Sequence, residues 1–161
     1  MYINNRNIQK PKTQDKKLVI AENVSITQKI LEEMLIDSIN DAHADYIRYS
    51  LLALKMETEE NQELLKTLAY NKYKHRRIFE EIYYTLTGEM YYVKEPNSPI
   101  ISHDLVAELT DRFFDELEAI EIRRDIMVSI ENVEIRDMLF EIITDGQNHA
   151  AVLNYILSAY R

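Results

Sequence analysis

The chain has 161 residues, with 28 Asp and Glu against 19 Lys and Arg, a formal net charge of −9 and no cysteine. The acidic balance argues against nucleic acid as a partner, because phosphate binding needs a basic face. The lack of cysteine excludes disulfides, thiolate metal sites and a cysteine nucleophile, and the presence of only two Gly and three Pro argues against a sheet with many tight turns.

The N-terminal stretch differs from the rest of the chain. Residues 1–25 are polar, lack a helical apolar period and, over residues 1–17, carry five basic residues against Asp15 alone. We interpret residues 1–25 as a flexible basic tail, mostly coil, and residues 26–161 as one bundle domain; a docking arm for an acidic partner is the alternative. No apolar run reaches the roughly 20 residues that a membrane helix needs, and no signal pattern opens the chain, so we expect a cytoplasmic protein without a membrane partner.

Two helices follow in the first half of the domain. Apolar residues at steps of three and four predict the first helix from about Thr27 to Met56. Thr58 is the expected N-cap of the second helix, and Gly88 its stop. The predicted buried stripes are Leu31, Met34, Leu35, Ile39, Ala42, Tyr46, Tyr49, Ala53 and Met56, then Leu64, Leu65, Leu68, His75, Phe79, Ile82 and Leu86.

The second half predicts another helical hairpin. A third helix starts near Ser102, and a short break follows at about Asn132. The fourth helix carries a predicted buried stripe that runs from Ile135 to Tyr160. The 14 residues 89–102 hold two prolines and reach about 46 Å when extended at about 3.3 Å per residue. A helix of about 25 residues is only about 37 Å long. We therefore predict an all-α four-helix bundle with an up-down-down-up order and a long crossover between helices 2 and 3.

Polar residues interrupt the apolar stripes at matching depth. Lys72 and His75 are three residues apart, as are Gly146 and His149, so each pair shares one helix face. Ala42 precedes Lys72 by 30 residues, and Glu116 precedes Gly146 by the same number. The chain therefore looks like two related helical hairpins.

These positions carry a resemblance to a family. The run Asp145-Gly146-Gln147-Asn148-His149-Ala150 resembles the Asp-Glu-x-x-His-Ala motif of the rubrerythrin-like branch of the ferritin-like di-iron carboxylate proteins. The resemblance covers about residues 30–160, and weaker similarities lie at residues 39–42 with Tyr49, at 72–75 with 83–88, and at 115–118. It implies a ferritin-like bundle in which helices 1 and 3 each supply a Glu, and helices 2 and 4 each supply Glu-x-x-His.

Only three of the six family ligand positions keep a ligand residue: His75, Glu116 and His149. Ala42, Lys72 and Gly146 stand where the family has Glu, and the lost residues include both carboxylates that bridge the metals. One carboxylate and two imidazoles do not offset the charge of two metal ions. A buried Lys72 needs a partner, and Glu116 is the predicted one. We therefore expect a protein without a cofactor that has lost di-iron oxidase or peroxidase chemistry and is not an enzyme. We expect it to serve as a structural or interaction module. Its partner would be a second copy of itself, in a homo-oligomer (a dimer), or another protein.

The alternative function is a metalloprotein that retains iron binding or oxidoreductase activity. His75, His149 and Glu116 form a 2-His-1-carboxylate set for a single Fe, Mn or Zn ion. Asp45, Asp41 or Asp145 would complete the site only if the helix faces rotate. Otherwise, both histidines are hydrogen-bonded core residues.

Gly146 needs an explanation, because glycine in a helix interior costs about 1 kcal/mol relative to alanine. Its space is filled by a bulky side chain such as Tyr49 or Lys72, which makes Gly146 a packing residue. Alternatively, it forms with Ala42 a pocket for a small ligand, which makes the protein a small-ligand binder. The third interpretation is a tolerated substitution without a role.

Overall fold

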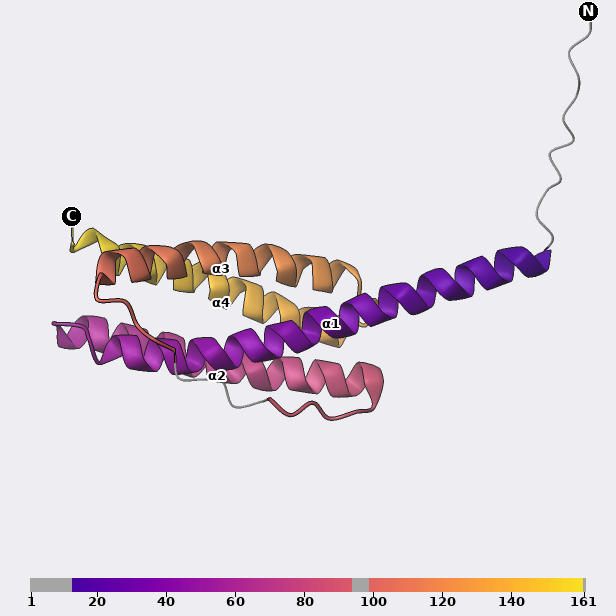
Figure 1. Ribbon diagram of the computed structural model, residues 1–161, viewed down its shortest axis with the longest axis horizontal. Coiled ribbons are helices and arrows are strands. Elements are labelled where there is room, and N and C mark those ends of the chain that lie inside the picture. The colour runs from indigo at the N-terminus through magenta and orange to yellow at the C-terminus, as the bar shows by residue number, and fades with distance from the viewer. Residues whose placement is uncertain (1–12, 94–98, 161) are drawn as a thin grey trace, which may run out of the picture.

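The computed structural model describes the backbone of residues 13–93 and 99–160, and the side chains of this part from Thr27 onward. It contains four helices, α1 (Thr13–Ala53), α2 (Glu59–Thr87), α3 (Leu105–Val128) and α4 (Val133–Ser158), and the described residues form no strand (Figure 1). The predicted all-α, four-helix architecture is therefore confirmed. Within the described ranges, no helix is long and apolar enough to cross a membrane.

Helix boundaries follow the capping residues. The Thr58 hydroxyl accepts a hydrogen bond from the Asn61 N–H at 3.2 Å and so caps α2. Gly88 ends α2 with a φ of 75°, a left-handed conformation that glycine adopts without a Cβ clash, and its N–H donates to the Tyr84 carbonyl. Asn132 caps α4 in the same way as Thr58 caps α2. Both predicted ends of α2 are confirmed, and α3 begins at Leu105 rather than near Ser102.

The first helix is longer than the sequence predicted. It begins at Thr13, so the expectation of coil was wrong for residues 13–25, while residues 1–12 lie outside the described part. The prediction rested on the absence of an apolar period, which reports burial against other helices rather than helicity. Residues 13–25 contain no Gly or Pro, so nothing in them breaks the helix. This part of α1 extends beyond the other three helices (Figure 1).

The bundle consists of two helical hairpins packed face to face. Helix α1 lies along α2, and α3 lies along α4 (Figure 1). Across the two hairpins, α1 contacts α3, and α2 contacts α4. Short joints at residues 54–58 and 129–132 hold each pair together.

Two apolar clusters fill the interior, one toward each end of the bundle. The first includes Leu52, Leu65, Leu109 and Leu153, and the second includes Ile39, Phe79, Ile126 and Leu139. On α2, α3 and α4 the predicted positions fall between the two clusters: Lys72 and His75, for example, lie between Ala69 and Phe79. The core is therefore divided by a polar layer at mid-height.

Most of the predicted stripe residues are buried, but two aromatic residues are not. Tyr46 is 38% exposed and Tyr160 is 36% exposed, contrary to the prediction. Tyr46 lies against Tyr73 in an edge-to-face contact on the outside of the α1–α2 pair, with ring centroids 5.8 Å apart. A tyrosine at the edge of an apolar stripe packs its ring while its hydroxyl stays in water, and apolar spacing alone does not distinguish it from a core residue.

Candidate functional site

The polar layer is built from all four helices. Helix α2 contributes Lys72 and His75, α3 contributes Glu116, and α4 contributes Gly146 and His149. All five residues are buried, as are Ala42 and Tyr49 of α1. The structure therefore brings every family ligand position that the sequence singled out into the interior of the bundle.

An ion pair lies at the centre of this layer. The Lys72 Nζ atom lies 2.6 Å from Glu116 Oε1, and both side chains are 1% exposed. The predicted Lys72–Glu116 pair is thus confirmed. The same Nζ atom donates a hydrogen bond to Asp45 Oδ2 at 2.8 Å. Asp45, considered from the sequence as a replacement metal ligand, is instead a second counterion of Lys72.

Glu116 is surrounded by hydrogen-bond donors. The Tyr49 hydroxyl donates to Oε1 at 3.0 Å, the Arg123 Nη1 atom lies 3.9 Å from Oε2, and His149 Nδ1 lies 3.6 Å from Oε1. Burial alone would raise the pKa of Glu116, but Lys72 and then His149 and Arg123 outweigh it and hold this pKa well below its usual range. Glu116 is therefore an ionised carboxylate inside the core.

The two histidines are hydrogen-bonded at their outer nitrogens. His75 Nε2 lies 2.9 Å from Asp145 Oδ2, and His149 Nε2 lies 3.2 Å from the Asn71 side-chain nitrogen. Their rings stack, with centroids 5.5 Å apart. Because a carboxylate only accepts, neutral His75 donates through Nε2; because an amide nitrogen only donates, His149 accepts through Nε2 and carries its proton on Nδ1, facing Glu116. Both are therefore hydrogen-bonded core histidines, as the simpler interpretation expected.

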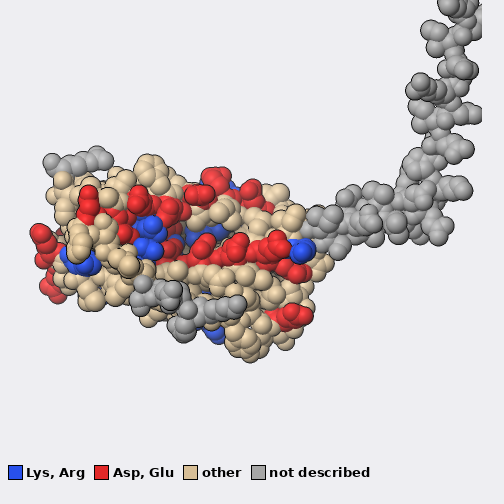
Figure 2. Space-filling model, in the orientation of Figure 1, with Lys and Arg blue, Asp and Glu red and all other residues tan. Residues whose placement is uncertain are grey.

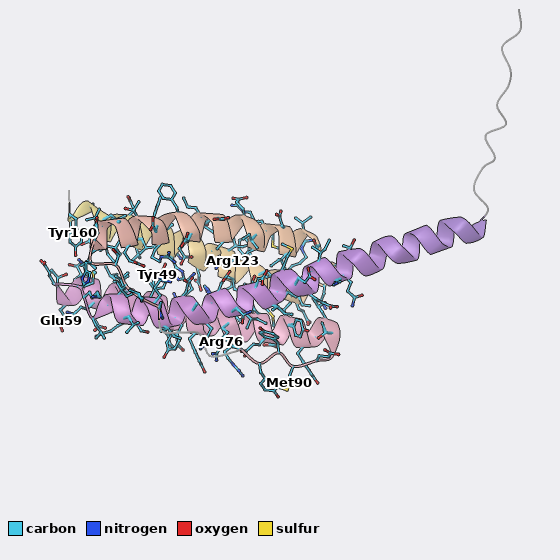
Figure 3. All side chains as sticks on the ribbon, viewed as in Figure 1. Tyr49, Glu59, Arg76, Met90, Arg123 and Tyr160 are labelled. Carbon is cyan, nitrogen blue, oxygen red and sulfur yellow. The ribbon has the colours of Figure 1, made fainter. Side chains whose placement is uncertain are left out.

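Arg123 is the residue that the sequence analysis missed. It is 6% exposed. A Cβ added at Gly146 would lie 2.9 Å from its Nη1 atom and 3.1 Å from Ile120 Cγ1. The packing interpretation of Gly146 is therefore confirmed, although the bulky side chains beside it are Arg123 and Ile120 rather than Tyr49 or Lys72. The same two side chains fill the ligand pocket that was the other interpretation. Figure 3 shows Tyr49 and Arg123 in the middle of the bundle, between α1 and α3.

A signal for Arg123 is present in the sequence. Arg123 follows Glu116 by seven residues, which is two helical turns, and therefore lies on the same face of α3. The resemblance to the di-iron proteins does not point to Arg123, because that resemblance concerns only the positions of metal ligands. The sequence analysis also missed Glu108, which is buried and whose Oε1 atom lies 3.1 Å from Arg48 Nη1.

The charges of the layer balance without a metal ion. Lys72 and Arg123 carry two positive charges, and Glu116 and Asp45 carry two negative charges. These residues therefore do not fit two metal ions: the Glu116 carboxylate already binds the Lys72 ammonium group, and the Arg123 guanidinium lies beside it. Among the residues whose side chains are described, no three His, Asp or Glu side chains form a group that could hold a metal ion.

Comparisons with known proteins add no relative. No protein-family model, no curated protein and no solved structure matches this chain.

The buried His75 predicts a pH dependence of stability. Burial lowers the pKa of His75 to about 3, although the hydrogen bond with Asp145 opposes the shift. In the unfolded chain a histidine has a pKa of about 6.5, so between these values the unfolded state binds a proton that the folded state does not. We expect the free energy of unfolding to fall as the pH drops from 6.5 to 5, by at most about 1.4 kcal/mol per pH unit from this residue. Urea unfolding followed by circular dichroism at several pH values measures it.

Two variants test whether His75 causes this pH dependence of the unfolding free energy. His75→Asn removes the titrating group, so the decrease in unfolding free energy between pH 6.5 and pH 5 becomes smaller. His103→Asn removes an exposed histidine and serves as the control. An equal decrease in His75→Asn and the wild type would show that His75 does not remain neutral in the folded protein.

Proposed function

We propose that this chain is a ferritin-like, rubrerythrin-related protein that has lost di-iron oxidase and peroxidase chemistry and serves as a structural or interaction module. In this proposal the Lys72–Glu116 ion pair stands where the family has its metals. The main support for this proposal is the 2.6 Å separation between Lys72 Nζ and Glu116 Oε1, both of which belong to buried side chains.

The arrangement of the helices supports the ferritin-like part of the proposal. In Figure 1, α2 ends near one end of the bundle and α3 begins near the other, while each hairpin has a short joint. This agrees with an up-down-down-up order and a crossover between α2 and α3. The polar layer also joins the hairpins, because Lys72 of α2 meets Glu116 of α3, and His75 of α2 meets Asp145 of α4.

The loss of metal chemistry is supported by electrostatics. A ferrous or ferric ion needs anionic oxygen ligands that are free to coordinate it. Here Glu116 Oε1 is taken by Lys72 and Tyr49, and Asp45 Oδ2 is taken by the same ammonium group. A metal ion would have to displace a buried cation and would leave that cation without a counterion, which is strongly unfavourable in a core.

One observation favours the alternative, a single metal ion on His75, His149 and Glu116. The Nδ1 atoms of both histidines and Glu116 Oε2 are buried and make no hydrogen bond within the described part of the chain. These atoms belong to a 2-His-1-carboxylate set of residues, but His149 Nδ1 carries a proton and would have to lose it before binding a metal ion. The positive charges of Lys72 and Arg123 weigh against this alternative, since both lie within 4 Å of the Glu116 carboxylate.

Metal analysis tests the proposal. Protein purified without chelators should contain far less than one equivalent of Fe, Mn or Zn, and titration with Fe(II), Mn(II) and Zn(II) should show no tight site. The physical reason is that Lys72 already neutralises Glu116. Tight binding of two equivalents would contradict the proposal. A single stoichiometric metal that is lost in both His75→Ala and His149→Ala would establish the alternative.

The interaction module is proposed to bind a second copy of itself as a dimer. Helix α3 presents apolar side chains to solvent at Val106, Phe114, Leu117 and Val128, of which Phe114 is 61% exposed and Val128 is 76% exposed. Steps of 8, 3 and 11 residues keep them on one outward side of the helix. An exposed apolar stripe of this kind typically marks an interaction surface, and a symmetric dimer would bury it in both copies.

Native mass spectrometry tests this association. We expect a dimer at about 10 μM protein, because burial of Phe114 and Leu117 in both copies favours micromolar or tighter association. Phe114→Glu should shift the protein to monomer, because it places a charge in the apolar contact. Tyr70→Glu, at an exposed aromatic residue of α2, is the matched control and should leave the dimer unchanged. A wild-type monomer would reject the dimer.

A further inference from the structure

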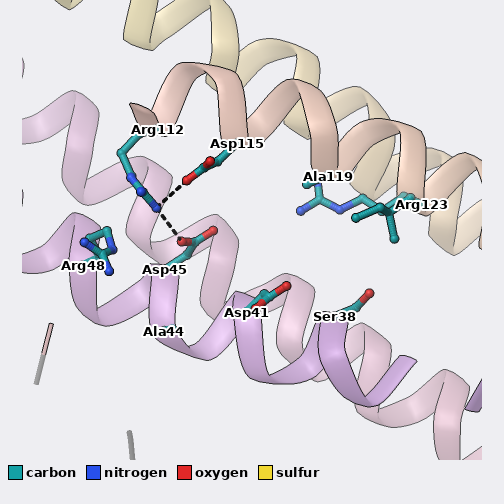
Figure 4. Close-up of a pocket in the computed structure, with 10 residues that line it drawn as sticks. Ser38, Asp41, Ala44, Asp45, Arg48, Arg112, Asp115, Ala119 and Arg123 are labelled. Carbon is teal, nitrogen blue, oxygen red and sulfur yellow. Dashed lines mark ion pairs between the residues drawn. The ribbon is translucent and has the colours of Figure 1, made fainter. Parts of the chain in front are cut away.

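A cleft between α1 and α3 lies beside the polar layer and is not used by the proposed function. It has a volume of about 220 Å³. Since one water takes about 30 Å³ in the liquid, the cleft has room for a ligand the size of an amino acid. Figure 4 shows its lining, which includes the charged residues Asp41, Asp45, Arg48, Arg112, Asp115 and Arg123.

Four of these six charged side chains have close partners. Arg112 Nη1 lies 2.7 Å from Asp115 Oδ2, Arg48 pairs with Glu108, and Asp45 pairs with Lys72. Figure 2 shows the resulting surface, on which basic side chains lie between bands of acidic ones over this face of the molecule. These pairs hold the walls of the cleft in place and do not need a ligand.

The other two, Asp41 and Arg123, have hydrogen-bonding groups without a hydrogen-bond partner among the described residues. Arg123 makes no hydrogen bond to any described residue, its Nη1 atom is buried, and its nearest acid is Glu116 at 3.9 Å. Asp41 is exposed at the mouth of the cleft and has no hydrogen bond or ion pair within the described part of the chain. The walls of the cleft partly desolvate the Asp41 carboxyl group, and this desolvation together with the neighbouring Asp45 raises its pKa. In Figure 4 both side chains reach into the space between α1 and α3.

The two groups differ in what they recognise. A guanidinium offers a planar fork of N–H donors that matches a carboxylate, whereas the Asp41 carboxylate accepts hydrogen bonds from an ammonium group. The six lining charges are three Asp and three Arg, so the cleft is neutral as a whole. A purely anionic ligand would meet three Asp, and a purely cationic one would meet three Arg. A ligand with both charges satisfies Arg123 and Asp41 together.

We propose that this cleft binds a small zwitterion of the free α-amino acid class, with the ligand carboxylate on Arg123 and its ammonium group on Asp41. Arg123, which is 6% exposed, forms the floor of the site, and Asp41 forms its mouth. The carboxylate contact is the stronger one, because it is removed from water. The site shares Arg123 with the polar layer but includes none of the residues of the 2-His-1-carboxylate set, so amino-acid binding and metal content are tested separately.

Isothermal titration calorimetry of the full chain with each of the twenty L-amino acids tests the proposal. We expect at least one to bind with a Kd of about 1 mM or below. Two analogues of that amino acid, one lacking the ammonium group and one lacking the carboxylate, should each bind about tenfold more weakly or not at all. For L-alanine these analogues are propionate and ethylamine. Absence of binding by all twenty, or equal binding of the carboxylate-only analogue, would overturn the proposal.

Three variants test whether the ligand binds between Arg123 and Asp41. Arg123→Gln should weaken binding by about tenfold or more, and Asp41→Asn by a smaller factor of about three to ten, because Asp41 is more exposed. Asp37→Asn removes an exposed acid of α1 outside the cleft lining and should leave the Kd unchanged. Asp41→Asn removes no ion pair and no hydrogen bond, so it keeps the test valid if Arg123→Gln fails to fold. A Kd unaffected by Asp41→Asn would place the ligand elsewhere and overturn the proposal.

Discussion

The Lys72–Glu116 ion pair is the constraint on which the rest of the bundle interior depends. Two opposite charges removed from water are tolerated only when each is compensated by the other and by further hydrogen bonds. Lys72 obtains a second acceptor from Asp45, and Glu116 obtains a donor from Tyr49. These partners come from three helices, so the pair fixes how α1, α2 and α3 lie relative to one another at mid-height. The apolar clusters on either side of the layer stabilise the bundle by burying apolar surface, but they do little to fix the relative positions of the helices.

Gly146 and Arg123 follow from the same constraint. With Lys72 alone, the buried layer would carry one cation against Glu116 and Asp45; Arg123 adds the second cation. Its guanidinium needs space next to α4, and a Cβ at Gly146 would come within 2.9 Å of it. The helix-weakening effect of a glycine at this position is thus offset by the room it leaves for a charged group. Lys72 and Gly146 thus act in the same direction, because Lys72 places a positive charge in the layer and Gly146 leaves room for that of Arg123.

Much of the fold was predictable because its signals are local or periodic. Thr58 and Gly88 act through backbone hydrogen bonds within a few residues, so the sequence identifies both ends of α2. The Lys72–Glu116 pair could be predicted because a buried lysine demands an acid, and because the resemblance implies a bundle that brings Glu116 to Lys72. The start of α1 at Thr13 could not, because the apolar period that marks a packed helix is absent where a helix extends beyond its neighbours. Arg123 was missed because its one signal, a position two helical turns after Glu116 on the same face of α3, is informative only once Glu116 is known to be buried.

A double-mutant cycle on the free energy of unfolding, using Lys72→Met, Glu116→Gln and the combined variant, measures how strongly the interior depends on this ion pair. We expect Lys72→Met alone to lower the unfolding free energy by about 3–5 kcal/mol, because it leaves a buried carboxylate without its main counterion. We also expect a coupling energy of about 2 kcal/mol or more, against less than about 1 kcal/mol for the same cycle at the exposed Lys66–Glu63 pair. A coupling energy at Lys72–Glu116 no larger than that of the exposed pair would show that the bundle does not depend on the buried pair.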